Sequence, residues 1–232
     1  MINRLVVNGC SYLNHYSQGK GHVDLAQQLN LAFSHSLAYP GSSNNRIIRT
    51  TLKDSYTTDQ PTLYIIGLSF LNRSELTIGQ DTDFEGKWIS FQNYINPDKI
   101  ADFWTDTDSQ QVIAHNLKME SYVIKDKLED LMFKLLAMIS NLRQRNHQVV
   151  IFRQPDDYYI NHLGEERFKF LKNCVNIVDG LSWSSLEFQA DKGVKYVPED
   201  HHHPKLIRHP APGEHQHLNK FLVEYIATHK LL

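Results

Sequence analysis

Residues 5–11 read Leu-Val-Val-Asn-Gly-Cys-Ser, an apolar and β-branched run that a glycine stops just before a serine. A short run of this composition is typical of a buried strand in a parallel sheet. The glycine permits a sharp turn, so the serine follows directly on the end of the strand. These seven residues therefore predict a strand that presents Ser11 at the carboxyl edge of a parallel sheet.

The rest of the chain alternates strand and helix patterns around this first strand. Further strands are predicted at 36–39, 62–66, 148–152 and 174–178. Helices are predicted at 23–31, at 111–145, at 168–171, at 218–226, and over a segment that carries Ile47, Ile48 and Leu52 after an N-cap at 42–44. Such alternation predicts a single domain, residues 1–232, built as a three-layer α/β sandwich with a central parallel sheet.

One segment, from about 70 to 109, does not fit the alternation. It is rich in aromatic, aspartate and asparagine residues with weak periodicity, and it is too long for a simple connection. We interpret it as an insertion with partial structure of its own. Its aromatic side chains suit either a small satellite core or a lid and substrate-binding wall that could face a carbohydrate.

Composition indicates an ordinary soluble globular protein. Hydrophobic residues make up 41% and charged residues 22%, and the formal net charge of −2 gives no reason to expect nucleic acid or a membrane surface as partner. No apolar stretch approaches the roughly 20 residues that span a bilayer, and the N-terminus lacks a signal-peptide pattern, so a cytoplasmic location is expected. Cys10 and Cys174 form neither a disulfide framework nor a zinc pattern, and each is expected to be buried.

Three loops that follow predicted strands carry unusual residues: 9–11, 40–45 and 67–69. Ligands of open parallel sheets bind at the carboxyl ends of the strands, so these loops are the first place to look for a site. A serine that follows a strand-ending glycine is placed well for a nucleophile, with backbone N–H groups nearby for an oxyanion. The alternative for Ser11 is a helix cap or a turn residue.

Taken in order, four segments of the chain resemble the conserved blocks of the SGNH/GDSL hydrolase superfamily. Residues 8–11 (Asn-Gly-Cys-Ser) resemble its G-D-S block, with Cys10 in place of the usual aspartate. Residues 38–44 (Ala-Tyr-Pro-Gly-Ser-Ser-Asn) resemble the second block, and residues 65–69 (Ile-Ile-Gly-Leu-Ser) occupy the third, normally G-x-N. Residues 209–215 (His-Pro-Ala-Pro-Gly-Glu-His) resemble the last block. The resemblance implies a flavodoxin-like sandwich and a serine hydrolase that needs no cofactor.

The resemblance also implies how a tetrahedral intermediate would be held. Ser11 would be the nucleophile, and the N–H of Gly41 would donate to the oxyanion. The asparagine of the third block is missing here; Ser69 stands at its position and can donate through its hydroxyl, while Asn72 is a possible substitute three residues later. Loss of one oxyanion donor costs about 3–4 kcal/mol of transition-state stabilisation, so this replacement matters.

Two histidines compete for the role of general base. Asp200 and His203 fit the family's D-x-x-H pattern literally, whereas His209 lies at the expected distance from the closing helix. We favour His209 as the base and keep His203 as the alternative. Asp200 is the preferred acid to orient either of them, with Glu199 next and a dyad without an acid as the remaining alternative. The histidine-rich segment from 201 to 217 could also bind a metal, but it lacks a metalloprotease spacing, so no metal is expected.

The sequence therefore predicts an ester hydrolase that acts on a small acyl or O-acetyl ester, possibly on a carbohydrate. Asn44, Arg46 and Arg73 are candidate substrate-binding residues, and the two arginines could instead pair with Glu75. Arg49 is expected to be an exposed helix charge. An acyltransferase on the same site, and a weakly active or inactive ligand-binding protein, remain the alternatives.

Overall fold

The computed structural model describes residues 1–69, 73–78, 87–92, 110–111, 124–152, 165–166, 169 and 215–232. Within these residues, the main sheet has four parallel strands in the order β2-β1-β3-β6. They span Arg4–Gly9 (β1), Phe33–Ser36 (β2), Thr62–Gly67 (β3) and Gln148–Phe152 (β6). The strands predicted at 62–66 and 148–152, and the one that ends at Gly9, are confirmed.

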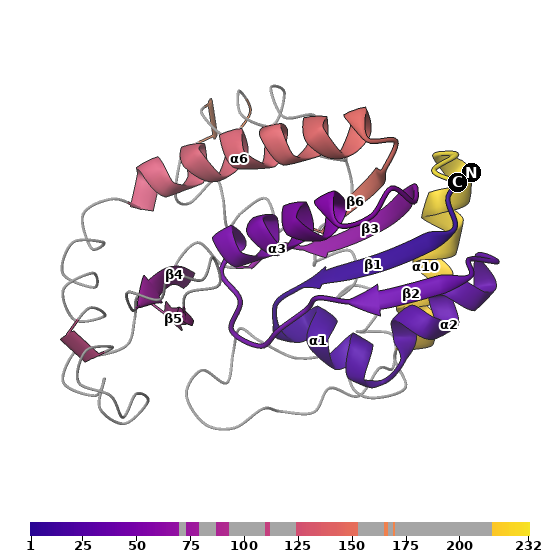
Figure 1. Cartoon of the computed structure of the whole chain (residues 1–232), viewed down its shortest axis with the longest axis horizontal. Coiled ribbons are helices and arrows are strands. Elements are labelled where there is room, and N and C mark those ends of the chain that lie inside the picture. The colour runs from indigo at the N-terminus through magenta and orange to yellow at the C-terminus, as the bar shows by residue number, and fades with distance from the viewer. Residues whose placement is uncertain are drawn as a thin grey trace.

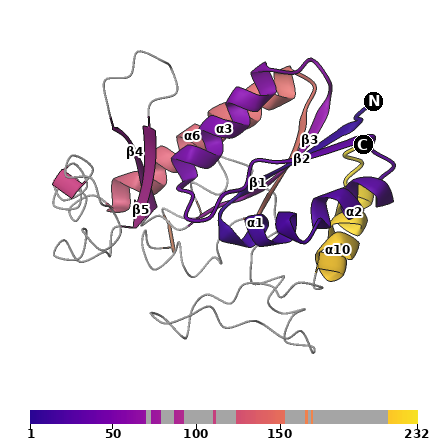
Figure 2. The ribbon, with the colours of Figure 1, turned by 60° about the horizontal axis from the view of Figure 1, so that its bottom comes forward.

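Helices cover both faces of this sheet (Figures 1 and 2). On one face lie α3 (Asn44–Tyr56) and α6 (Ile124–Gln144), packed against the side chains of Val6, Tyr64 and Ile151. The opposite face carries α1 (Ser11–Gln18), α2 (Gly21–Gln28) and α10 (His215–Thr228), packed against side chains such as Leu5 and Ile65. Successive strand side chains point to opposite faces, so the continuous apolar strands supply both cores. The predicted three-layer sandwich is confirmed.

The second strand was placed too late in the sequence-based prediction. It spans Phe33–Ser36 rather than 36–39, and its side chains alternate between exposed and half-buried at one edge of the sheet. Its serines and histidine give little apolar signal, and the strand forms because its backbone pairs with buried β1. The apolar residues that suggested a strand at 37–39 lie in the connection that follows it.

One helix end also differs from the prediction, and one helix was missed. Helix α1 has weak helix formers, and it is held in place by the buried side chains of Leu13 and Tyr16; the Tyr16 hydroxyl donates to Asn219 Oδ1 of α10 at 2.6 Å. Helix α2 ends at Gln28 rather than continuing to 31. Asn30 takes a positive φ of 55° there, and the N–H of Leu31 closes the turn on the carbonyl of Ala26 at 2.8 Å.

The predicted insertion contains an antiparallel pair of strands, β4 (Arg73–Ile78) and β5 (Lys87–Gln92). The side chain of Glu75 on β4 is buried and pairs with Arg49 of α3 at 2.6 Å, so the expectation that Arg49 is an exposed helix charge is wrong. The predicted strand 174–178 and residues 112–123 of the predicted long helix lie outside the described residues. Of the predicted helix 168–171, only residue 169 is described. The aromatic side chains of the insertion also lie outside the described part.

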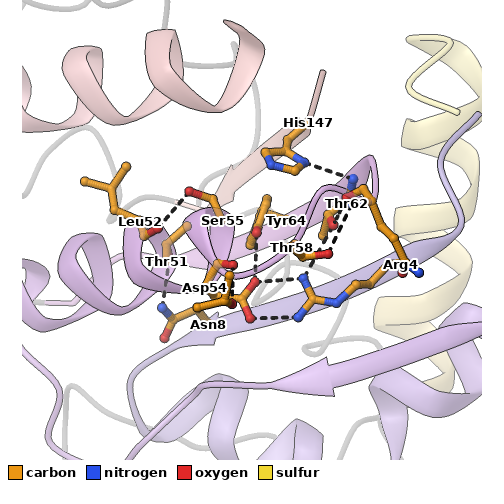
Figure 3. A network of polar contacts seen from close by, with 12 residues as sticks. Arg4, Asn8, Thr51, Leu52, Asp54, Ser55, Thr58, Thr62, Tyr64 and His147 are labelled. Carbon is orange, nitrogen blue, oxygen red and sulfur yellow. Dashed lines mark hydrogen bonds and ion pairs between the residues drawn. The ribbon is translucent and has the colours of Figure 1, made fainter. Parts of the chain in front are cut away.

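A polar network joins the amino ends of the strands (Figure 3). The guanidinium of Arg4 donates two hydrogen bonds to the carboxylate of Asp54, at 2.8 and 2.7 Å, and the hydroxyl of Tyr64 donates to the same carboxylate at 2.8 Å. Nearby, the backbone N–H of Thr62 donates to Nδ1 of the buried His147 at 3.1 Å. This network ties the end of α3 to β1 and β3 at the edge where those strands begin.

Replacement of Asp54 by asparagine is expected to lower the free energy of unfolding at pH 7 by about 1–3 kcal/mol, the usual range for hydrogen bonds to a charged group. Burial alone would raise the pKa of Asp54, but the hydrogen bonds from Arg4 and Tyr64 outweigh it and hold that pKa below its ordinary value of 3.8. A lowered folded-state pKa adds stability that is complete above the unfolded value and is lost as the pH falls through the folded value.

Urea unfolding of the wild type and Asp54→Asn at pH 7 and at pH 3 measures this difference. The gap between the two proteins should narrow at the lower pH. The matched control is Asp130→Asn, which removes the carboxylate of an exposed pair with Lys134 on α6 and should change stability by less than about 0.5 kcal/mol. A gap of the same size at both pH values would contradict the assigned role of the Asp54 charge.

Candidate active site

The carboxyl ends of the parallel strands bring the predicted loops to one edge of the sheet. Gly9, the last residue of β1, lies opposite Gly67, the last residue of β3. The ladder continues past β3, because the N–H of Leu68 donates to the carbonyl of Phe152 at 2.8 Å. Ser11 begins α1 two residues after β1 ends. The loops that start at Gly9 and Gly67 are therefore neighbours.

Gly9 is needed because the backbone is crowded where β1 turns into α1. A Cβ atom at this position would lie 2.9 Å from the carbonyl oxygen of Gly67, closer than real Cβ atoms come to other atoms, and at a tight 3.0 Å from Cδ1 of Leu13. The absence of a side chain lets the start of α1 approach the neighbouring strand end. Cys10, which follows, is 1% exposed, as expected for a structural cysteine.

The position of Ser11 at the start of a helix matters for its backbone. The first N–H groups of a helix have no acceptor within the helix, and the helix dipole makes this end partly positive. The first helical bond of α1 runs from the N–H of Asn14 to the carbonyl of Cys10 at 3.0 Å. An anion next to Ser11 would therefore meet N–H groups that the helix itself does not use. The side chain of Ser11 lies outside what the structure describes.

The loop that contains Gly41 is tied to the end of β1. The N–H of Leu37 donates to the carbonyl of Val7 at 2.8 Å, and the N–H of Tyr39 donates to the carbonyl of Gly9 at 3.1 Å. The chain then turns, and Gly41 takes a φ of 75°, which residues with a side chain rarely adopt. A Cβ built on Gly41 would meet nothing within 4 Å, so its backbone conformation, not lack of space, calls for glycine.

The loop after β3 is locked to the first residue of α3. The side chain of Asn44 donates from Nδ2 to the carbonyl of Ser69 at 2.9 Å and accepts the N–H of Ser69 on Oδ1 at 2.7 Å. Asn44 is 6% and Ser69 1% exposed. Asn44, predicted to bind substrate, thus uses both ends of its amide to set the backbone at position 69. The helix N-cap is Ser43, whose hydroxyl accepts the N–H of Arg46 at 3.1 Å.

The two arginines predicted to bind substrate have different surroundings. Arg73 of β4 donates from Nη1 to the hydroxyl oxygen of Ser69 at 3.1 Å. Arg46 donates to the hydroxyl of Ser42 at 3.1 Å and to the carbonyl of Leu37 at 3.3 Å, and its guanidinium lies 4.9 Å from the centre of the Tyr39 ring. Burial lowers the pKa of Arg46 from its ordinary value. Both arginines therefore border the loops at the carboxyl edge.

Several predicted site residues cannot be placed. His209, His203, Asp200 and Asn72 lie outside the described residues. The structure joins Asn44 to the backbone of Ser69 and ties the loop of Gly41, through Tyr39, to the end of β1 that precedes Ser11. It adds an unexpected ion pair between Arg49 and Glu75. These two residues are 26 positions apart, and their opposite charges were the only sign in the sequence that they could pair.

The described part of the chain offers neither a metal-binding cluster nor a membrane-spanning helix. There, no group of three or more histidine, cysteine, aspartate or glutamate side chains could hold a metal ion. Among the described helices, none combines the length and the apolar character that crossing a membrane requires.

The fold is that of a known esterase over nearly its whole length. The psychrotrophic esterase EstA from Pseudoalteromonas sp., in a structure inhibited by monoethylphosphonate, aligns with a TM-score of 0.51 and 10% sequence identity, covering 97% of both chains. The chain has an SGNH-hydrolase fold.

Other SGNH-fold structures align with lower TM-scores. TesA matches with 13% identity over 99% of both chains and a TM-score of 0.45. A member of the lipolytic protein G-D-S-L family from Veillonella parvula matches with 14% identity over 95% of this chain and 96% of its own, with a TM-score of 0.47. No family model matches the sequence. No curated protein matches it either.

Proposed function

We propose that this chain is a serine-dependent hydrolase of small acyl or O-acetyl esters, with Ser11 as nucleophile. One observation carries the proposal: the hydrogen bond from the Tyr39 N–H to the Gly9 carbonyl. This bond brings the loop of Gly41 beside the strand end that leads to Ser11, and Ser69 follows the neighbouring strand. Acyl transfer to serine needs a serine hydroxyl and backbone N–H donors close together, and the carboxyl edge of this sheet offers both in the proposed site.

In the proposed reaction, His209 takes the proton of the Ser11 hydroxyl while the oxygen attacks the carbonyl carbon of the ester. The negative charge that develops on the carbonyl oxygen is stabilised by the N–H groups of Ser11 and Gly41 and by a side chain at position 69. The leaving alcohol takes the proton from His209, and an acyl-enzyme remains. Water then attacks the acyl-enzyme with His209 as base and releases the acid, restoring Ser11. Asp200 orients the imidazole, and His203 is the alternative base.

The surroundings of the loop support an alcohol portion with a flat apolar face, such as a sugar ring. Tyr39 is 58% exposed at the carboxyl edge, and the cation of Arg46 lies over its ring. An aromatic ring held in this way offers a rigid surface for stacking. The hydrogen bonds of Arg46 to the loop 37–42 assign it first to holding that loop, so any contact with substrate would use its remaining donors.

Covalent labelling tests this function without knowledge of the substrate. A fluorophosphonate should react with the Ser11 oxygen, which forms a phosphorus–oxygen bond as fluoride leaves. Mass spectrometry should find one label per chain, on the peptide that contains Ser11. Label should be lost in Ser11→Ala and kept in the matched control Ser140→Ala, which alters an exposed serine on α6. Labelling of Ser11→Ala at the wild-type level would contradict the proposal, as would no labelling of the wild type.

A further inference from the structure

Position 69 stands where the resemblance expects an asparagine, and the structure shows which of its groups are already used. The N–H of Ser69 donates to Asn44 Oδ1 at 2.7 Å, and its carbonyl accepts from Asn44 Nδ2 at 2.9 Å. A serine carries one backbone donor and one hydroxyl donor. Since Asn44 uses the backbone donor, the hydroxyl is the group through which Ser69 can donate to an oxyanion.

The direction of that hydroxyl depends on Arg73. The guanidinium has donors and no acceptor, so the contact from Arg73 Nη1 to Ser69 Oγ at 3.1 Å makes the hydroxyl oxygen the acceptor. The hydroxyl hydrogen must then point away from Arg73. A cation on the oxygen also polarises the O–H bond, because hydrogen bonds in series strengthen one another in a buried setting. Ser69 is 1% exposed, so water competes little for either interaction.

Arg73 is itself held by the way β4 is anchored. Arg73 and Glu75 are two residues apart on the same strand and therefore point to the same face. Glu75, whose side chain is 1% exposed, is paired at 2.6 Å with Arg49 of α3. The same helix begins with Asn44, which fixes the backbone of Ser69. Helix α3 thus holds both partners of the contact between Arg73 and Ser69; Figure 1 shows β4 next to this helix.

We propose that Arg73 is a positioning residue that aims and polarises the hydroxyl of Ser69, so that this pair supplies the oxyanion donor that an asparagine supplies elsewhere in the SGNH fold. This inference rests on the proposed function. In this proposal, Arg73 compensates for the serine that replaces the asparagine of the G-x-N block. Arg73 belongs to the insertion and not to the loop that follows β3. In this arrangement Arg73 acts on the transition state through Ser69 and binds no part of the ester itself.

A double-mutant cycle tests the coupling, with kcat and KM measured for a p-nitrophenyl ester. Ser69→Ala should lower kcat about 100-fold, the usual loss for one oxyanion donor, with KM changed less than about threefold. Arg73→Met should lower kcat about tenfold through the misaligned hydroxyl. The double variant should be no slower than Ser69→Ala alone, because Arg73 then has no hydroxyl to position. Losses that multiply, or an Arg73→Met defect confined to KM, would overturn the proposal.

Two conservative variants keep the test valid if a truncation unfolds the loop. Arg73→Lys retains a cationic donor and should recover most of the activity lost in Arg73→Met. Ser69→Asn supplies an amide donor that needs no cation to aim it, so Arg73→Met should cost less than about threefold in that background. A full tenfold loss there would also overturn the proposal. The matched control is Arg143→Met on an exposed part of α6, expected to match the wild type.

Ser11→Ala separates failure of this inference from failure of the proposed function. If Ser11→Ala is as active as the wild type, the serine-hydrolase function is wrong. The double-mutant cycle of Ser69 and Arg73 then says nothing about an oxyanion donor, and the inference falls with the function. If Ser11→Ala is inactive and the cycle is additive, the hydrolase stands and only the role of Arg73 is refuted. Inactive Ser11→Ala together with a coupled cycle supports both.

Discussion

Replacing Ser11 with alanine is expected to lower kcat/KM for p-nitrophenyl acetate by at least about 10⁴-fold, because the variant has no oxygen to form the acyl-enzyme. The remaining activity would come from the N–H groups of the loop at Gly41 and of the start of α1, which can still polarise the ester carbonyl. KM should change little, since the alanine removes no binding surface of comparable size.

Steady-state kinetics of the wild type, Ser11→Ala and the control Ser140→Ala measure this effect. Folding of each protein is checked by far-UV circular dichroism and by the unfolding midpoint, since Ser11 is the first residue of α1. A burst of p-nitrophenol equal to the enzyme concentration in the wild type, absent in Ser11→Ala, would show the acyl-enzyme directly. Equal rates for the wild type and Ser11→Ala would remove the hydrolase assignment and favour a ligand-binding protein on this fold.

The second large effect concerns the base. His209→Ala is expected to lower kcat by about 10²- to 10⁴-fold, the range that general-base assistance contributes, whereas His203→Ala should stay within about threefold of the wild type. Helix α10 begins at His215, and Asn219 in it is held by Tyr16 of α1, the helix that begins with Ser11. The start of α10 is therefore tethered to α1, and His209 lies six residues before that start in the sequence.

The pH dependence gives an independent readout of the base. Only the neutral imidazole accepts the serine proton, so kcat/KM of the wild type should rise with pH through the range where histidine ordinarily titrates, near pH 6.5. This rise of kcat/KM with pH should be absent in His209→Ala and present in His203→Ala. Added imidazole should restore part of the activity of His209→Ala. The opposite pattern, with the rise lost only in His203→Ala, would assign the base to the D-x-x-H segment instead.

Sequence reasoning succeeded for the parts of the fold that rest on continuous apolar runs. The strands β1, β3 and β6 are buried on both faces, so each contains a run of three or four apolar residues that is easily recognised. It failed for β2 and α1, whose residues are polar and of weak propensity. The backbone of β2 is held by pairing with β1, and α1 is held by Leu13 and Tyr16 packed under the sheet. Such long-range support leaves no local signal.

The candidate site shows the same division. The parallel order of the strands was enough to predict that the loops of Ser11, Gly41 and Ser69 meet at one edge. It did not show that Asn44 would bind the backbone of Ser69, or that Arg73 would contact its hydroxyl. Those partners depend on the exact course of the loop backbones and on how β4 packs against α3. Spacing along the chain carries no information about that packing.

The polar network of Arg4, Asp54 and Tyr64 lies at the amino edge of the sheet, the opposite end from the loops of the candidate site. Substitutions in it would change how many chains are folded at a given moment and leave the turnover of each folded chain as it was. In a cell, where degradation follows the unfolded fraction, such changes would alter abundance alone. Selection for a new ligand at the candidate site would therefore change the loops at the carboxyl edge. Any stability lost through those changes can be restored by substitutions at the amino edge.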